Sequence, residues 1–473
     1  MTDPNNSGGK GPVLAFLLLM AALAVMMLAG CAVGPDYKRP DLELPKDYGV
    51  AQSPAPAPQK WWTVFGDPVL DRFVEEALAA NHDLKAAAAR IEQARGRYMI
   101  DRAGLSPDAG IDGRISRDRA SGLGAADIPP EFLETKTHRL VLRASWELDF
   151  WGKYRRATEA ARAELVAGEA GREAIRASLI GDVVRGYFAL HALDRRLDAV
   201  ERTLQGREKA LELQKVRLDA GTVSELEYRQ VESDLRAAQA LVPVIRQLRV
   251  RQEGALALLL GRSPREVYDA RIDRGTPAYP TIEVPAGLPS DLLLRRPDVR
   301  EAEEQLHAAN ARIGVARAAY FPSITLTGFF GGESQALRDL FTAQARTWSI
   351  AGGLLQPLFA GGQIRGGVKV AEGRQRELEE MYRKAVANAF REVRDAISAQ
   401  VNLREAAAAQ RGRESSLGRT YELARLRYDN GAISLFEVID TERQLLLARL
   451  EAIDAERDRR DAIVDLYLAL GAS

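Results

Sequence analysis

The chain has 473 residues, more than one average domain, and its 66 lysines and arginines equal its 66 aspartates and glutamates in number. A net charge of zero gives no electrostatic reason to expect nucleic acid or another polyanion as a partner. Charged residues make up 28% of the chain and aromatic residues only 7%, a composition that favours long helices with solvated faces.

An apolar segment stands at the N-terminus. Residues 13–28 form an apolar run, too short for a comfortable membrane span, which predicts a lipoprotein signal peptide over residues 1–30. The small residues directly before Cys31 resemble the lipobox of bacterial lipoproteins; the alternative is an ordinary buried thiol. Because Cys31 is the only cysteine and ends the run, we expect it to carry a covalent N-terminal lipid. Ala32 is not the aspartate typical of inner-membrane retention, so the resemblance implies transfer to the outer membrane.

A tether, a helix and two strands are expected next. Residues 31–60 are rich in proline and predict an extended, lipid-anchored tether. From Pro68 to Leu105 the apolar residues have helical spacing without an internal proline, which predicts one helix. Apolar and polar residues then alternate over Ile111–Ser116 and Thr137–Phe150, and this alternation predicts two strands.

A long helix and a tight turn complete the first half. Trp151 to Leu218 contains no proline and predicts a helix on the order of 100 Å long. Gly221 is expected to adopt the left-handed conformation that ends a helix, and Ser224 to cap the helix that returns as far as Gly261. Prolines then recur as far as Pro297, which predicts a linker that wraps the outside of the helices.

The second half repeats the first. Residues 212–235 match residues 422–445 at an offset of 210, and residues 83–113 match 298–328 at an offset of 215. The helix, strand, strand, long helix, turn and helix are therefore expected twice. In the second half the strands are expected at Ser323–Phe330 and Thr347–Leu358, the long helix at Gly361–Tyr428, the turn at Gly431 and the helix cap at Ser434. The expected segments are a signal (1–30), a tether (31–60), a first repeat (61–261), an equatorial linker (262–296) and a second repeat (297–473).

The strands suggest a membrane location. Strands of about ten residues with one apolar face and one small or polar face suit a transmembrane barrel, and a soluble antiparallel sheet is the alternative. Four strands alone would leave unpaired backbone amides in hydrocarbon, so several copies of the chain are needed to close a barrel. Two copies give eight strands filled by side chains, whereas three give twelve strands and room for a lumen.

The residues that carry chemistry in enzymes are not grouped. The four histidines are scattered without the spacing of a metal site, and no nucleophile has a base at a recognisable spacing. There is no glycine-rich loop of the kind that binds phosphate. We therefore expect no enzymatic activity, no metal and no cofactor other than the lipid.

Three stretches carry a family resemblance. They are Cys31-Ala32-Val33-Gly34-Pro35-Asp36-Tyr37, Gly287–Leu293 with Arg295-Arg296-Pro297-Asp298, and Ala309–Ala316 continuing through Phe321-Pro322-Ser323-Ile324. They resemble the lipoprotein, NodT/OprM-like branch of the TolC-like outer-membrane factor family. The resemblance implies a mainly α, tandem-duplicated TolC-like fold in which a homotrimer forms a 12-stranded transmembrane β-barrel and a long periplasmic α-helical barrel.

The resemblance also implies a function. The chain is expected to be the outer-membrane channel of a tripartite efflux system, a passive exit duct for small toxic compounds and drugs. An inner-membrane pump of the resistance-nodulation-division class would drive export through a periplasmic adaptor protein. One alternative is a TolC-like duct for type I protein secretion or metal-ion efflux. A second, from another class, is a lipid-anchored structural coiled coil without a pore.

The candidate site residues lie near the turns. Glu437 and Asp440 are three residues apart and hence on one helix face, where the alternative is an ordinary exposed surface. The resemblance implies that they form carboxylate rings at a periplasmic gate, with Phe436 as an apolar gate residue. It also implies that Tyr428 tethers the inner hairpin to its neighbour, for which Glu227 is a plausible acceptor. Ile433 stands where TolC has an arginine, so the closing network is expected to differ.

Overall fold

The computed structural model describes residues 32–43, 60–123, 129–269, 271–275, 294 and 296–472. The chain divides into two compact units, each built from both halves of the sequence. The strand unit comprises Met1–Asp41, Ile91–Gly168 and Ala302–Tyr382, and the helix unit comprises Leu42–Arg90, Glu169–Glu301 and Arg383–Ser473. Cys31, residues 1–30 and most of the predicted linker lie outside the described residues.

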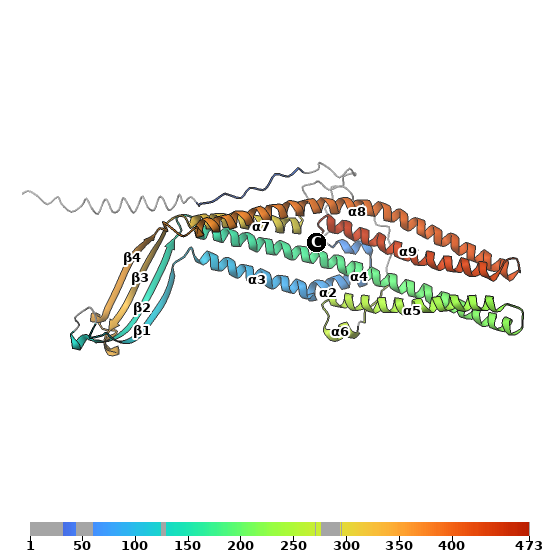
Figure 1. Ribbon diagram of the computed structural model, residues 1–473, viewed down its shortest axis with the longest axis horizontal. Coiled ribbons are helices and arrows are strands. Elements are labelled where there is room, and N and C mark those ends of the chain that lie inside the picture. Colours follow the sequence, from blue (N-terminus) through green and yellow to red (C-terminus); the bar gives the residue numbers. More distant parts are fainter. Residues whose placement is uncertain are drawn as a thin grey trace, which may run out of the picture. The chain divides into compact units, whose positions relative to one another are not determined.

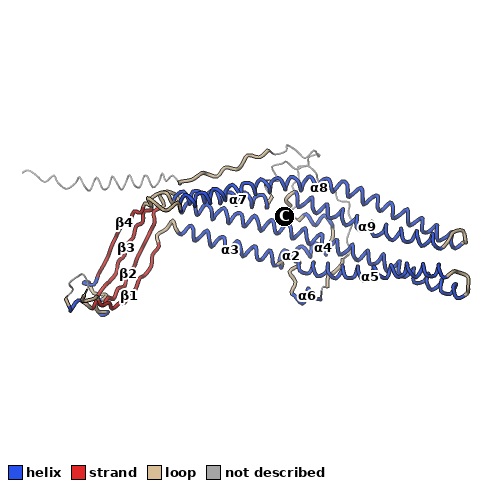
Figure 2. Tube along the Cα trace, viewed as in Figure 1, coloured by secondary structure: helices blue, strands red, loops and turns tan. Residues whose placement is uncertain are grey.

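Helices account for most of the described chain (Figure 2). They are α2 (Pro68–Ala80), α3 (His82–Ala103), α4 (Lys153–Asp219), α5 (Glu225–Leu259), α6 (Pro264–Asp269), α7 (Pro297–Ala318), α8 (Gln363–Asp429) and α9 (Leu435–Ala469). The strands are β1 (Asp108–Arg119), β2 (Glu134–Leu148), β3 (Ser323–Ser334) and β4 (Arg346–Leu355). Two strands, a long helix and a returning helix therefore follow one another twice, as the sequence predicts (Figure 1).

The two long helices are continuous. Both α4 and α8 have 67 residues, which corresponds to about 100 Å at the rise of an α-helix. Their bounds agree with the prediction to within two residues at each end. Among the described residues, no helix is both long enough and apolar enough to cross a membrane.

The four strands form one antiparallel sheet in the order β1-β2-β3-β4. The register places Ile111 beside Leu142, Leu142 beside Phe330, and Phe330 beside Trp348. These four side chains form one apolar row across the sheet, and their exposed fractions are 75%, 57%, 58% and 68% in strand order. The sheet therefore presents an apolar face to its surroundings, as the alternation of residues predicts.

The other face of the sheet is polar. The Arg139 guanidinium lies 3.6 Å from the Glu333 carboxylate on the next strand and 4.5 Å from the centre of the Phe329 ring. Within the described residues, β1 and β4 each pair with a neighbouring strand on one side only. The sheet thus has two edges whose backbone groups are available for pairing.

The single helix expected from Pro68 to Leu105 is wrong, because the chain breaks at Asn81. The Asn81 backbone has a ψ of 133°, so it cannot continue α2. Its Oδ1 atom accepts hydrogen bonds from the backbone N–H groups of Asp83 and Leu84, at 2.9 and 3.1 Å, and so caps α3. Two shorter helices therefore replace one.

The described part of the tether is docked on the strand unit. The Asp36 carboxylate lies 2.7 Å from the Arg156 guanidinium of α4, and the Asn310 side chain of α7 donates to the Pro35 carbonyl oxygen at 2.9 Å. A Cβ on Gly34 would lie 2.5 Å from the Gly314 Cα atom, so the two backbones meet directly. The extended tether is thus held between α4 and α7.

Aromatic side chains fill the core of the helix unit. Trp61 stacks on Tyr467 with ring centres 5.1 Å apart, and Phe65 contacts the edge of Phe188 at 4.8 Å. The buried Asp67 carboxylate caps α2 and accepts a hydrogen bond of 2.6 Å from the Tyr187 hydroxyl. These contacts join the start of the first repeat to α4 and α9.

Candidate functional site

The two hairpin turns have the same backbone geometry. Gly221 and Gly431 have φ angles of 69° and 72°, in the left-handed region that favours glycine. Each glycine N–H donates to the carbonyl three residues before it, and the next residue donates to the carbonyl five residues before it. These paired hydrogen bonds form a Schellman motif, which ends α4 and α8 in tight turns as predicted.

The serines after the turns cap the returning helices. The Ser224 Oγ atom accepts from the Glu227 N–H at 3.2 Å, and the Glu227 carboxylate accepts from the Ser224 N–H at 2.8 Å. In the second repeat the Ser434 N–H donates to the Glu437 carboxylate at 3.3 Å. Both glutamates named from the sequence therefore complete a capping box within their own hairpin.

The other gate candidates lie on the first turns of α9. The Asp440 carboxylate accepts from the Arg443 guanidinium and the Gln444 amide, both at 2.5 Å, and its side chain is 31% exposed. The Phe436 side chain is 59% exposed. Phe436 therefore presents an apolar ring to its surroundings, whereas the Asp440 carboxylate forms an ion pair and a hydrogen bond within its own helix. Their place at a gate stays a prediction.

Tyr428 contacts α4 near the turn. Its hydroxyl accepts a hydrogen bond of 2.6 Å from the Arg217 Nη1 atom and one of 3.5 Å from the Gln214 amide. This contact joins the last turn of α4 to the last turn of α8 within one chain. The sequence did not point to Arg217 as the partner of Tyr428, although Arg217 stands within about one helical turn of Gly221, as Tyr428 does of Gly431.

Arginines at regular spacing join α4 to α9. Arg185, Arg196 and Arg207 are eleven residues apart, which is close to three helical turns, so they lie along one face of α4. They pair in turn with Asp465, Asp454 and Glu442 of the antiparallel helix α9. The regular spacing was the available sequence signal for this ladder.

Of these three ion pairs, the one nearest the turns, between Arg207 and Glu442, is the most buried. Arg207 and Glu442 have side-chain exposures of 6% and 19%, and their atoms approach to 3.1 Å. A second Arg207 nitrogen donates to the Asp234 carbonyl oxygen of α5 at 2.6 Å. Arg207 of α4 therefore contacts both returning helices, α5 and α9.

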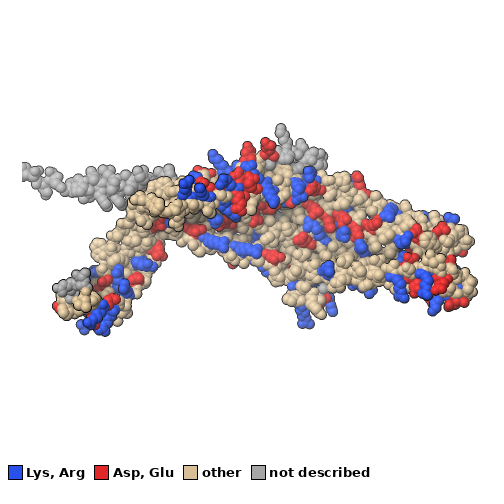
Figure 3. All heavy atoms as spheres, in the orientation of Figure 1, with Lys and Arg blue, Asp and Glu red and all other residues tan. Residues whose placement is uncertain are grey.

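The turn between α4 and α5 carries charges of both signs. Figure 3 shows acidic and basic side chains intermingled on the visible face near this turn. Among them Arg229 pairs with Glu225 at 3.3 Å and with Glu232 at 2.8 Å. The charges near this turn therefore pair with opposite charges on the same helix.

One acidic group of α9 is held in an unfavourable setting. Burial raises the pKa of the Asp461 carboxyl to about 6, although Arg457 and Arg185 nearby act to lower it and Asp458 and Asp465 to raise it. Its Oδ1 atom is buried without a hydrogen-bond partner among the described residues. Ionisation of this group therefore opposes folding.

Replacing Asp461 with asparagine is expected to stabilise the protein at about pH 7.5 and to have little effect at about pH 4. Because the folded pKa of about 6 exceeds the ordinary 3.8, the folded chain binds more protons between these values. The stability associated with the neutral carboxyl is present below the ordinary pKa and is lost as pH rises through 6. Asparagine removes an ionised group that costs about 3 kcal/mol at the higher pH.

Thermal unfolding of the two proteins at both pH values measures this effect. The control is Asp198→Asn, because the Asp198 side chain on α4 is exposed to solvent. It is expected to give no stabilisation at either pH. A lower unfolding temperature for Asp461→Asn at about pH 7.5 would show that the carboxylate is favourable in the fold.

The chain matches a known family along most of its length. The family model described as outer membrane efflux protein matches residues 73–262 and 288–472, once in each half. The chain is 31% identical over 459 residues to the cation efflux system protein CusC of Escherichia coli, covering 96% of this chain and 98% of that protein. It is 34% identical over 465 residues to the solvent efflux pump outer membrane protein SrpC of Pseudomonas putida, covering 95% and 96%.

The fold agrees with solved structures. The crystal structure of the CmeC outer membrane channel of Campylobacter jejuni matches with a TM-score of 0.89 at 27% identity, covering 93% of this chain and 95% of that one. The open state of the MtrE outer membrane channel of Neisseria gonorrhoeae matches with a TM-score of 0.81 at 31% identity, covering 93% and 98%. The chain therefore belongs to the outer membrane efflux protein family, has a TolC-like fold, and functions as an efflux channel of the outer membrane.

Proposed function

We propose that the channel is a homotrimer in which β1 of each subunit pairs with β4 of the next to form a 12-stranded barrel. The observation that supports this assembly is the exposed apolar face of the sheet between two edges that each lack one neighbour. An unpaired backbone group in hydrocarbon costs several kcal/mol, so the edges must pair before the sheet is stable in lipid. Three copies leave room for a lumen, whereas two copies do not.

The duct is proposed to be passive. It catalyses no reaction and holds no cofactor, and an inner-membrane pump of the resistance-nodulation-division class supplies the energy through a periplasmic adaptor. Adaptor contact at the hairpin turns would move the inner hairpin, α8 and α9, between two packings. The Arg217–Tyr428 hydrogen bond supports this proposal, because a contact that joins α8 to α4 beside the turns would hold the closed packing.

The gate is proposed to consist of Asp440, Glu437 and Phe436 from three subunits. The exposed Phe436 ring supports an apolar constriction, since threefold symmetry would bring three such rings together. Glu227 remains the proposed acceptor for a contact between neighbouring subunits. For such a contact its carboxylate would have to share or release its own cap at Ser224.

A lipid on Cys31 is proposed to anchor the chain beside the barrel. The position of the next residue supports this proposal. A Cβ on Gly152 would lie 2.7 Å from the Ala32 Cβ atom, and the Val33 N–H donates to the Trp151 carbonyl oxygen at 3.0 Å. Both contacts lie just after the end of β2, so the docked tether would deliver the lipid to the membrane surface.

The cargo is proposed to be small organic toxic compounds, with metal ions or a type I secreted protein as alternatives. CusC is described as a cation efflux protein and SrpC as part of a solvent efflux pump, so the family does not select one cargo. Deletion of the gene followed by exposure to drugs, solvents, copper and silver separates the cargo classes. Sensitivity to metals alone would overturn the organic cargo.

Planar-bilayer recording of the purified, lipidated protein tests the duct itself. The expected result is discrete conductance from a trimer that is heat-modifiable on gel electrophoresis. A protein that inserts but gives no conductance would contradict the pore. A soluble monomer after removal of the lipid would contradict the barrel.

A further inference from the structure

Two helix junctions in the helix unit are built in the same way. At the first, the Asn81 Nδ2 atom donates a hydrogen bond of 2.9 Å to the carbonyl oxygen of Leu259, the last residue of α5. At the second, the Arg296 Nη1 atom donates one of 3.0 Å to the carbonyl oxygen of Ala469, the last residue of α9. Each donor stands directly before the first residue of another helix, α3 or α7.

The duplication relates these two contacts. Arg296 follows Asn81 by 215 positions and Ala469 follows Leu259 by 210, the offsets that relate the two halves around them. The donor thus differs between the repeats, an amide in one and a guanidinium in the other. The acceptor is in both repeats the carbonyl oxygen of the last residue of the returning helix. The last carbonyls of a helix have no partner within it and form the negative end of its dipole. A donor at this place therefore joins two helices end to end.

The junctions differ in how closely their backbones meet. Gly261 and Gly471 follow α5 and α9 with φ angles of 70° and 77°. A Cβ on Gly261 would lie 2.3 Å from the Ala80 carbonyl oxygen, so backbone packs on backbone at the first junction. A Cβ on Gly471 would first meet the Arg296 Cγ atom at 3.2 Å, so a side chain separates the helices at the second.

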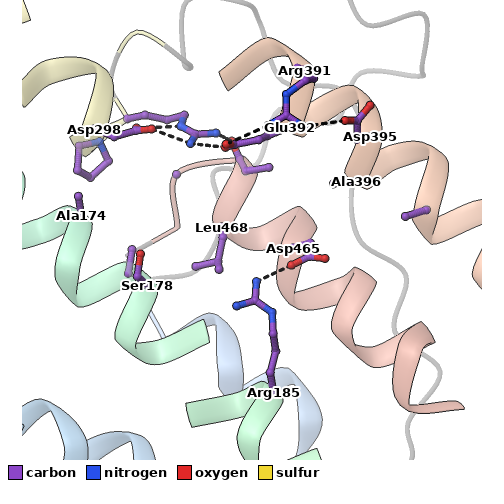
Figure 4. A pocket seen from close by; sticks show the side chains of 16 residues that line it. Ala174, Ser178, Arg185, Asp298, Arg391, Glu392, Asp395, Ala396, Asp465 and Leu468 are labelled. Carbon is purple, nitrogen blue, oxygen red and sulfur yellow. Dashed lines mark hydrogen bonds and ion pairs between the residues drawn. The ribbon is translucent and has the colours of Figure 1, made fainter. Parts of the chain in front are cut away.

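Arg296 also connects the second junction to α8. Its guanidinium, 9% exposed, binds the Asp298 carboxylate of α7 at 2.9 and 3.0 Å and the Glu392 carboxylate of α8 at 2.6 Å. Dashed lines in Figure 4 mark these contacts to the two carboxylates. One side chain therefore holds the end of α9, the start of α7 and the middle of α8.

Open space adjoins the second junction. A cavity of about 500 Å³ is lined by residues from both sides of the junction, Ala469 and Gly471 on one and Arg296 on the other. Its remaining walls come mostly from α4 and α8, where the small residues Ala174 and Ala396 stand among charged side chains such as that of Asp395 (Figure 4). At Ala174 and Ala396 the wall consists of small side chains, so open space is left there into which a helix can shift without displacing packed atoms.

We propose that the junction between α9 and α7 is the hinge about which α9 turns when the channel opens, with Arg296 as its positioning residue, and that the junction at Asn81 is rigid. This inference rests on the proposed movement of the inner hairpin. Helix α9 has 35 residues and is about 52 Å long, so each degree of tilt at the hinge moves its far end by about 0.9 Å. The carbonyl contact keeps the helix ends together while the cavity takes up the tilt. The tilt must also break the ion pairs that Arg196 and Arg207 of α4 make with α9.

Filling the cavity tests the hinge. Ala174→Leu and Ala396→Leu, from opposite walls, are each introduced into a background opened by Arg217→Ala. Each is expected to reduce the conductance gained in that background by about fivefold, because the added side chain occupies the space needed for tilt. The matched control is Ala237→Leu on the exposed face of α5, which is expected to retain the full gain.

The two donors are then compared. Arg296→Leu is expected to raise the open fraction about fivefold, and Arg296→Asn, which restores the amide donor of the first repeat, by less. Asn81→Asp keeps the cap of α3 but removes the donor to Leu259, so it is expected to lower the unfolding temperature without changing the open fraction.

The outcomes separate two failures. Absence of any conductance from the parent protein would contradict the duct and not the hinge in particular. Full opening in both filled variants, with correctly folded trimers, would overturn the hinge while leaving the duct intact. A change in the open fraction from Asn81→Asp equal to that from Arg296→Leu would show that the two junctions are mechanically alike.

Discussion

Arg217→Ala is expected to raise the fraction of time that the channel spends open in planar bilayers by about tenfold. The Arg217 Nη1 atom donates a hydrogen bond of 2.6 Å to the Tyr428 hydroxyl and so joins α4 to the inner hairpin beside the turns. A hydrogen bond from a charged donor contributes about 1.5–3 kcal/mol, and 1.4 kcal/mol corresponds to a factor of about ten in population. Single-channel recording measures the change directly.

The duplication supplies the control for this experiment. Arg427 occupies the position of Arg217 in the second repeat and its side chain is exposed, so Arg427→Ala is expected to leave the open fraction unchanged. Tyr428→Phe is expected to match Arg217→Ala, and the two together to add little, because they remove the same bond. An unchanged closed state in both single variants would remove this contact from the gating mechanism.

A further substitution separates contacts within a subunit from those between subunits. Adding Glu227→Ala to Tyr428→Phe is expected to raise the conductance further if Glu227 also binds a neighbouring subunit. Because Glu227→Ala also removes the cap of α5, Glu227→Gln serves as the variant that retains an acceptor there. If the double variant conducts no more than Tyr428→Phe alone, Glu227 has only its capping role.

Ile350→Arg is expected to prevent assembly of the channel in the outer membrane. Ile350 lies near the middle of β4 with its side chain 84% exposed, on the same face as Trp348. An arginine on the lipid face near the middle of the bilayer costs about 2–4 kcal/mol, and a trimer would incur that cost three times. The measurement is the amount of heat-modifiable trimer in outer-membrane fractions.

Ser349→Arg is the matched control on the adjacent residue. Successive side chains of a strand point to opposite faces, so Ser349 shares the face of its partner Phe329 and not that of Ile350. This variant is expected to assemble, with altered conductance if that face lines the lumen. Equal loss of trimer in both variants would show that the exposed apolar face does not meet lipid.

Local patterns were sufficient for the regular elements. The bounds of α4 and α8 follow from long stretches without proline, and the turns at Gly221 and Gly431 follow from glycines placed after a helical run. The alternation in the strands also predicted which face of the sheet is apolar. These features depend on residues that are neighbours in the chain, so a single sequence is enough to predict them.

Contacts between distant residues were not predictable in the same way. Asn81 can cap a helix locally, but the same residue also occurs inside helices, and the break is further stabilised by a bond to Leu259, 178 residues further along the chain. The contact between Tyr428 and Arg217 within the chain was not predicted, and the contact of Tyr428 with Glu227 of a neighbouring hairpin stays a prediction. Both depend on which helix ends lie beside one another.

The duplication, the strands, the long helices and the turns follow from the order of residues alone, because spacing along the chain sets hydrogen bonding and burial within each element. Which side chains meet at the ends of those elements depends on how distant segments pack. The tertiary structure distinguishes the tight junction at Gly261 from the looser one at Gly471, and it shows Arg296 joining three helices. Helix ends leave donors and acceptors unpaired, and their partners come from whichever distant segment packs against them.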